Sequence, residues 1–254
     1  MIEMMVLSFT LILTRTAAFV AVLPSLGGSS TPRTVKIGLA ASLAFLYFLL
    51  LGGNAAPPEL TKEGVSWVAF AVVEMKEAIL GAFLGYAMSL VLLPVQIAGD
   101  YIGQEMGLAL AAQSDPSATN PSLVLSQLFQ MLAGVLFLSL DGHHLFLAAL
   151  HSTFMRIRIG GWSGLTAAGP MVTGLAAAQE WGLMLAAPVG ALLFLSSIIL
   201  ALMTRAAPQM NIFSLGFTLR IALGLGGMFL LMPDFISAVV RSIAHMGDLL
   251  ERLV

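Results

Sequence analysis

The sequence predicts an all-α membrane protein built from several apolar helices. Of its 254 residues, 59% are hydrophobic and 9% are charged, whereas soluble domains average roughly 45–50% and roughly 25%. Apolar segments close to the ~20 residues needed to cross a bilayer recur along the chain. No extended polar stretch separates them, so one domain over residues 1–254 is expected.

The first two predicted spans are residues 4–23 and 35–51. The first follows Glu3 rather than a basic run and contains Arg15, so it is expected to be a retained helix rather than a cleaved signal peptide. The second is entered through Pro32 and is followed by glycines and prolines, which end helices.

Residues 65–95 form a third, longer apolar segment with charged residues in its first half. Glu74 and Glu77 are three residues apart, so they share one face of the predicted helix and could bind an arginine of a neighbour. A proton relay through these carboxylates is a weaker alternative, because carboxylates inside membranes also serve transport.

The stretch 98–122 is too polar to span a membrane and too apolar for an ordinary surface loop. Loops longer than ~12–15 residues are usually functional or disordered, and Tyr101, Ile102 and Met106 argue against disorder. Because unpaired backbone cannot face lipid, this loop is expected to be buried in protein or to line a cavity.

Four further segments are predicted in the C-terminal half. Residues 123–140 end where Gly142 lets the backbone leave a helix. The Ala- and Gly-rich stretch 164–180 is short for a span and is expected to be a re-entrant or packed helix. Residues 181–203 carry no charge and form the strongest span, and with 212–232 they predict a helical hairpin.

The C-terminal segment, residues 235–253, has a different character. Its apolar residues recur at helical spacing, with Arg241, His245, Asp248 and Arg252 between them. This pattern predicts an amphipathic helix that lies at an interface or against a partner.

Arg15 and Arg220 each lie inside an apolar segment. An ionised side chain there costs a few kcal/mol and normally faces the interior of a bundle or water, so both are predicted to have a functional or assembly role. The alternative is that they snorkel to the membrane surface.

The distribution of basic residues does not fit a simple serpentine topology. Arg33 and Lys36 would place the first loop in the cytoplasm. Strict alternation would then put the acidic 98–122 stretch inside and Arg156 and Arg158 outside. Some segments are therefore expected to be held by partner subunits rather than by lipid.

Several function classes find no support in the sequence. No nucleophile, phosphate-binding or dinucleotide motif occurs, so no enzyme activity and no cofactor are expected. His143, His144 and His151 lack the further ligands of a metal site. The net charge of −2 and the absence of a basic run argue against nucleic acid.

Five short motifs occur together along the chain. They are Pro32-Arg33 with residues 35–40; Ala98-Gly99 with residues 102–108; Asp115-Pro116; Gly142-His143-His144; and Arg205 with residues 207–213 and 216–217. In this combination the chain resembles, over nearly its whole length, the FliR family of the flagellar type III protein export gate.

This resemblance implies a non-enzymatic subunit that joins FliP and FliQ in a helical pore. The pore would lie in the bacterial inner membrane at the flagellar basal body, partly above the membrane plane, and would pass unfolded flagellar proteins. FlhB and FlhA are the further implied partners. A FliP-like part is expected over about residues 1–180, and a FliQ-like hairpin with a C-terminal helix over about residues 181–254.

The resemblance also implies roles for particular residues. The loop 106–122 would form a plug that closes the resting pore, although Glu105 departs from the commoner family pattern beside it. The implied plug residues are Met106, Gly107, Leu108, Leu110, Gln113, Asp115 and Pro116. The residues expected to hold partner subunits are Arg15, Arg33, Lys36, Glu74, Glu77, Arg205, Pro208, Gln209, Asn211, Phe213 and Arg220.

Two other functions are weighed against this one. The homologous injectisome subunit would share the fold and mechanism but serve a needle complex; Gly216-Phe217 favours the flagellar branch. A proton-coupled small-solute transporter would account for Glu74 and Glu77, but it predicts inverted repeats, which the sequence does not display.

Overall fold

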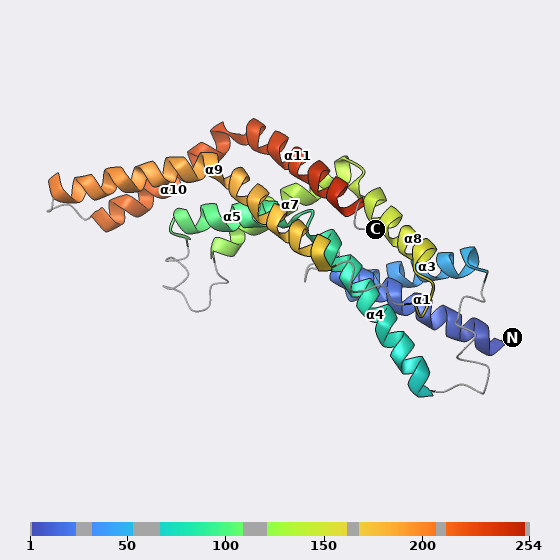
Figure 1. Cartoon of the computed structure of the whole chain (residues 1–254). Helices are drawn as coiled ribbons and strands as arrows, with labels where there is room; N and C mark the ends of the chain where they lie inside the picture. The colour runs from blue at the N-terminus through green and yellow to red at the C-terminus, as the bar shows by residue number, and fades with distance from the viewer. Residues whose placement is uncertain are drawn as a thin grey trace. The chain divides into compact units, whose positions relative to one another are not determined.

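The computed structural model describes most of the chain, and nearly all of the described residues lie in helices (Figure 1). The described residues are 2–23, 32–52, 67–108, 121–161, 168–206 and 212–251. No strand occurs among them, which confirms the all-α class. The chain divides into two compact units, which are interleaved along the sequence.

The first unit comprises Met1–Leu90, Asp141–Gly174 and Asp248–Val254. Its helices are α1 (Ile2–Val22), α3 (Arg33–Leu50), α4 (Trp67–Ser89) and α8 (Gly142–Arg156). Helix α1 packs against both α3 and α4. Glycine permits the close approach of α1 and α4, because a Cβ on Gly85 would lie only 2.7 Å from the Phe19 carbonyl oxygen.

The second unit comprises Val91–Leu140 and Leu175–Gly247. It contains α5 (Leu93–Glu105), α7 (Pro121–Ser139), most of α9 (Ala168–Ala206), α10 (Ile212–Leu230) and most of α11 (Met232–Glu251). Helix α5 packs against α7, where a Cβ on Gly99 would lie 2.7 Å from the Ser126 Cα. A Cβ on Gly182 of α9 would lie 2.8 Å from the Ile97 side chain of α5.

The predicted spans 4–23 and 35–51 are confirmed as α1 and α3. The expectation of one segment over 65–95 is wrong, because α4 ends at Ser89 and α5 begins at Leu93. Pro94 lies in the first turn of α5. It has no backbone N–H to donate into a preceding turn, so it can begin a helix but not continue one.

The first part of the 98–122 stretch is not a loop, because residues 98–105 complete α5. The stretches 164–180 and 181–203 also do not form separate helices; both belong to the 39-residue α9, with Pro188 in its interior. Ala- and Gly-rich sequence is compatible with helix once packing supplies the stability.

Two helix boundaries differ from those expected: one in the residue that leaves the helix, and the other in where the helix ends. At the end of α7 the left-handed conformation is adopted by Asp141, at φ 56°, while Gly142 begins α8. Asp tolerates this region better than most residues. The span expected over 212–232 ends at Leu230, and α11 begins at Met232 after a bend of 69°.

Helix α11 is amphipathic, as predicted. Val239, Ile243 and Met246 are buried on one face, and Arg241 and His245 are exposed. The apolar face therefore packs inside the protein, and the charged residues lie outside it.

Among the described residues, three helices are long and apolar enough to cross a membrane: α1, α3 and the 171–206 part of α9. Up to six spans result if each of three interrupted helix pairs counts as one. The expectation of several membrane-compatible helices is confirmed. The division at about residue 180 stays a prediction.

Candidate functional site

The first unit is built around a buried ion pair between Arg15 of α1 and Glu77 of α4. Arg15 Nε donates to Glu77 Oε2 at 2.5 Å, and the two side chains are 1% and 0% exposed. Glu77 Oε1 also accepts a hydrogen bond from the Gly160 backbone N–H at 2.7 Å. The carboxylate is therefore satisfied from two directions, as a buried charge requires.

The end of α8 completes the surroundings of the guanidinium. Arg15 Nη1 donates to the carbonyl oxygens of Thr153 at 3.2 Å and Ile157 at 3.3 Å. The Arg15 Cζ lies 4.6 Å from the centroid of the Phe154 ring, which in turn stacks on Tyr47 of α3 at 4.5 Å. The cluster thus joins four helices of the unit.

The neighbouring carboxylate is also paired. Glu74 Oε2 accepts a short hydrogen bond from the Thr14 hydroxyl. The structure therefore brings together three predicted assembly residues, Arg15, Glu74 and Glu77, within one unit. Their role in holding partner subunits stays a prediction. One donor of this cluster is unsatisfied, because Arg15 Nη2 is buried without a hydrogen-bond partner among the described residues.

In the second unit, the turn that follows α5 holds the described part of the predicted plug. Met106 is 2% exposed, and Gly107 adopts φ 79°, a conformation that favours glycine. A Cβ on Gly224 of α10 would lie 2.6 Å from the Met106 sulfur, and one on Gly107 would lie 3.6 Å from the Phe217 ring. Helix α10 therefore supports this turn directly.

Arg220 lies on the same face of α10, between Phe217 and Gly224. Its Nε is buried and has no hydrogen-bond partner within the described residues. The structure thus places a predicted assembly residue beside the predicted plug turn. An unsatisfied buried donor is costly, so this arginine is suited to accept a partner that the isolated chain does not supply.

The other predicted site residues are scattered or lie outside the described parts. Arg33 and Arg205 are exposed, Lys36 is half-buried and Leu108 is half-buried. Phe213 lies in α10. The predicted site residues that lie outside the described parts of the chain are Leu110, Gln113, Asp115, Pro116, Pro208, Gln209 and Asn211.

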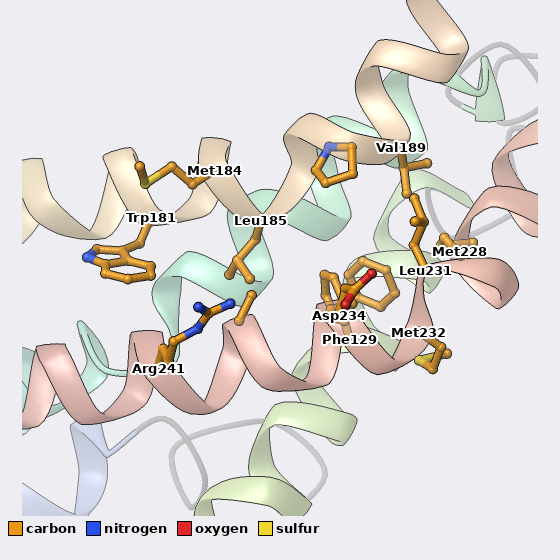
Figure 2. Close-up of a pocket in the computed structure, with 13 residues that line it drawn as sticks. Phe129, Trp181, Met184, Leu185, Val189, Met228, Leu231, Met232, Asp234 and Arg241 are labelled. Carbon is orange, nitrogen blue, oxygen red and sulfur yellow. The ribbon is translucent and has the colours of Figure 1, made fainter.

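The second unit also contains an apolar cavity of about 410 Å³ between α9 and α11 (Figure 2). Trp181, Leu185 and Val189 line it from α9, and Asp234 and Arg241 contribute from α11. The sequence does not predict this cavity. The sequence shows the apolar residues of α9 and α11, but the volume left between the two helices depends on their tertiary packing.

One group of side chains could in principle hold a metal ion. The ligand atoms of Asp141, His143 and His144 lie within 4.8 Å of one another and are exposed or half-buried. They lie at the amino end of α8, where the helix dipole disfavours a cation. The arrangement carries no metal assignment.

Residues 6–246 match the family model described as "Bacterial export proteins, family 1". The chain belongs to this family. It is 34% identical to "Flagellar biosynthetic protein FliR" of Escherichia coli (strain K12) over 228 residues, which cover 87% of this chain and 82% of the relative. A protein of the same name from Bacillus subtilis (strain 168) is 29% identical over 93% of this chain and 90% of its own length.

A third relative of that name, from Aquifex aeolicus (strain VF5), is 27% identical over 86% of this chain and 83% of its own length. These matches extend through both compact units rather than covering one of them. The resemblance inferred from short motifs is thereby confirmed for the family.

Proposed function

We propose that this export-family protein, which serves flagellar assembly, is a non-enzymatic subunit of the flagellar export gate. It would join FliP and FliQ in a pore of the bacterial inner membrane at the basal body, with FlhB and FlhA as further partners. Unfolded flagellar proteins would cross through that pore. The observation that carries the proposal is the family match over residues 6–246, together with relatives that share one flagellar name.

The surface of the isolated chain supports a role in an assembly. Large apolar side chains remain exposed on α10, where Phe229 is 82% exposed, and on α4, where Val68 is 77% exposed. Exposed apolar residues of this kind mark contacts with protein or lipid. A subunit that packs among partners within a membrane would cover them.

The packing of Met106 and Gly107 against α10 supports a gating role for the 106–122 loop. One end of that loop is fixed by α10, so movement of α10 relative to partner subunits would be felt by the plug. Arg220, on the contacting face of α10, would hold a partner acceptor and couple assembly to closure.

The proposal is tested by recovering the chain together with FliP and FliQ. All three would be expressed together, with a purification tag on this chain, and the recovered FliP and FliQ would be quantified. We expect Arg220→Leu to reduce that recovery at least several-fold, because leucine cannot replace the buried Nε donor that Arg220 offers to a partner. The matched control is Arg156→Leu, which changes an exposed arginine at the end of α8.

Undiminished recovery with Arg220→Leu would remove that residue from the interface, and failure of the wild-type chain to recover either partner would contradict the proposed function. The transporter alternative gains nothing from the structure, because Glu74 and Glu77 are both engaged in hydrogen bonds inside the unit. The injectisome alternative would be revealed by needle-complex rather than flagellar partners.

A further inference from the structure

The cavity between α9 and α11 has the dimensions and lining of a site for an apolar ligand. Its volume of about 410 Å³ lies within the range of roughly 300–1,000 Å³ found for small-molecule sites. The walls are formed mainly by aliphatic and methionine side chains, among them Met184, Leu185, Val189 and Met228. A polar ligand would find few hydrogen-bond partners there.

One end of the cavity is polar and positively charged. In Figure 2 the Arg241 side chain extends from α11 toward α9, beside Trp181 and Leu185. Arg241 Nε donates to the Ser237 carbonyl oxygen, and Arg241 has no ion pair with another described residue. His245, one turn further along α11, lies with its ring centroid 5.4 Å from that of Trp181.

The other charged residue of the lining, Asp234, is distant from this end. It precedes Arg241 by two helical turns, which separates the two by roughly 10 Å along the helix axis. It lies in the first turn of α11, where a carboxylate stabilises the helix dipole. An anion at Arg241 would therefore not meet it.

The sequence of α9 gives the cavity a direction relative to a membrane. Glu180 is the last charged residue before a charge-free run that reaches Arg205, and Trp181 begins that run. Tryptophan is enriched where hydrocarbon meets headgroups. The Trp181 end thus matches a headgroup level, and the cavity extends from it toward Val189 along the charge-free part of α9.

We propose that this cavity holds one acyl chain of an anionic phospholipid, with the lipid phosphate bound at Arg241 beside Trp181. The apolar walls take the chain, and the two terminal guanidinium nitrogens of Arg241 supply a bidentate contact that suits phosphate. Phospholipid is also the apolar ligand that a membrane-compatible helix meets in abundance.

The test uses Trp181 as the reporter of occupancy. Replacing the other two tryptophans, Trp67→Phe and Trp162→Phe, leaves a single fluorophore in the full-length chain. This protein, stripped of lipid in detergent, is titrated with phosphatidylglycerol or phosphatidylcholine carrying dibrominated acyl chains, which quench tryptophan on contact. We expect saturable quenching at one lipid per chain, with at least tenfold tighter binding of phosphatidylglycerol.

Two variants separate the parts of the site. Ala238→Phe fills the cavity and should abolish saturable quenching, whereas the control Ala201→Phe alters an exposed position elsewhere and should not. Arg241→Gln should remove the preference for phosphatidylglycerol, and the control Arg205→Gln should keep it. If Ala238→Phe does not fold, the lipid preference of Arg241→Gln still tests the proposed phosphate contact.

Three results would overturn the proposal. The first is quenching that rises without saturation, and the second is equal binding of the two lipids by the protein with Arg241 intact. The third is loss of the bound lipid when FliP and FliQ are added, because the cavity would then receive a partner side chain instead.

Discussion

Arg15 and Glu77 are the residues on which the first unit depends most. Both charges are withdrawn from water, and desolvation of an ion costs several kcal/mol before any attraction is counted. Three backbone groups of residues 153–160 and the Phe154 ring offset that cost by binding one or other partner. The pair therefore fixes the end of α8 against α1 and α4.

Removing one member of this pair should lower the stability of the chain far more than removing both. Arg15→Met leaves the Glu77 carboxylate buried without its partner, and we expect the stability of the detergent-solubilised chain to fall by about 3–5 kcal/mol. The double variant Arg15→Met with Glu77→Leu replaces both charges by apolar groups and should recover most of that loss. Thermal unfolding followed by circular dichroism measures both variants.

Additive losses in the double variant would show that the charges do not compensate one another, contrary to the geometry.

Glycine at the α1–α4 contact provides a second residue-scale prediction. Gly85→Ala places a methyl group 2.7 Å from the Phe19 carbonyl oxygen and should lower stability by about 1–3 kcal/mol, the usual cost of overpacking. Gly38 of α3 is the matched control, because no atom lies within 4 Å of its added Cβ. There the higher helix propensity of alanine should raise stability by up to about 1 kcal/mol.

Chemical denaturation of the two alanine variants shows directly whether each substitution raises or lowers the stability of the chain. Equal effects at Gly85 and Gly38 would mean that α1 and α4 are not in close contact.

At the scale of elements, the contact between α10 and the turn after α5 tests the proposed gating role of the 106–122 loop. Gly224→Val would drive a branched side chain into Met106, whose sulfur lies 2.6 Å from the nearest added Cβ. We expect the predicted plug turn to shift and potassium to leak from vesicles that contain the assembled complex. Gly226→Val on the same helix meets nothing within 4 Å and should leave the vesicles sealed.

A sealed membrane with Gly224→Val, in a complex that assembles normally, would separate this contact from closure of the pore.

Helices α3 and α11 were predictable from local signals in the sequence. Pro32 and the glycines after residue 51 mark the ends of α3, and apolar residues at helical spacing with charged residues between them mark α11. The break at Ser89 was missed although Pro94 signals it, since a continuous apolar run masks a proline. Helix α9 was divided because its Ala- and Gly-rich first half lacks strong hydrophobic periodicity.

The candidate site was only partly predictable. The sequence identifies Arg15, Glu77 and Arg220 as unusual, because charge inside an apolar segment is visible locally. It does not reveal which partner each one finds. The acceptors of Arg15 are mainly backbone carbonyls near residues 153 and 157, and backbone groups carry no signal of their own in the sequence.

At the scale of the whole molecule, the two compact units are each interleaved from separate stretches of sequence. The buried ion pair lies in the first unit, and the predicted plug turn and the apolar cavity both lie in the second. Exposed apolar surface remains on several helices. A chain with this surface is expected to function within a larger assembly rather than alone.

If this chain is a subunit of the flagellar export apparatus, the export of flagellar proteins depends on it. The direct measurement is to delete its gene in the source bacterium and quantify hook and filament proteins in the culture medium. Both are expected to disappear from the medium while their synthesis continues, and the wild-type chain should restore them. Continued export of flagellar proteins without the chain, or loss of needle-complex substrates alone, would contradict it.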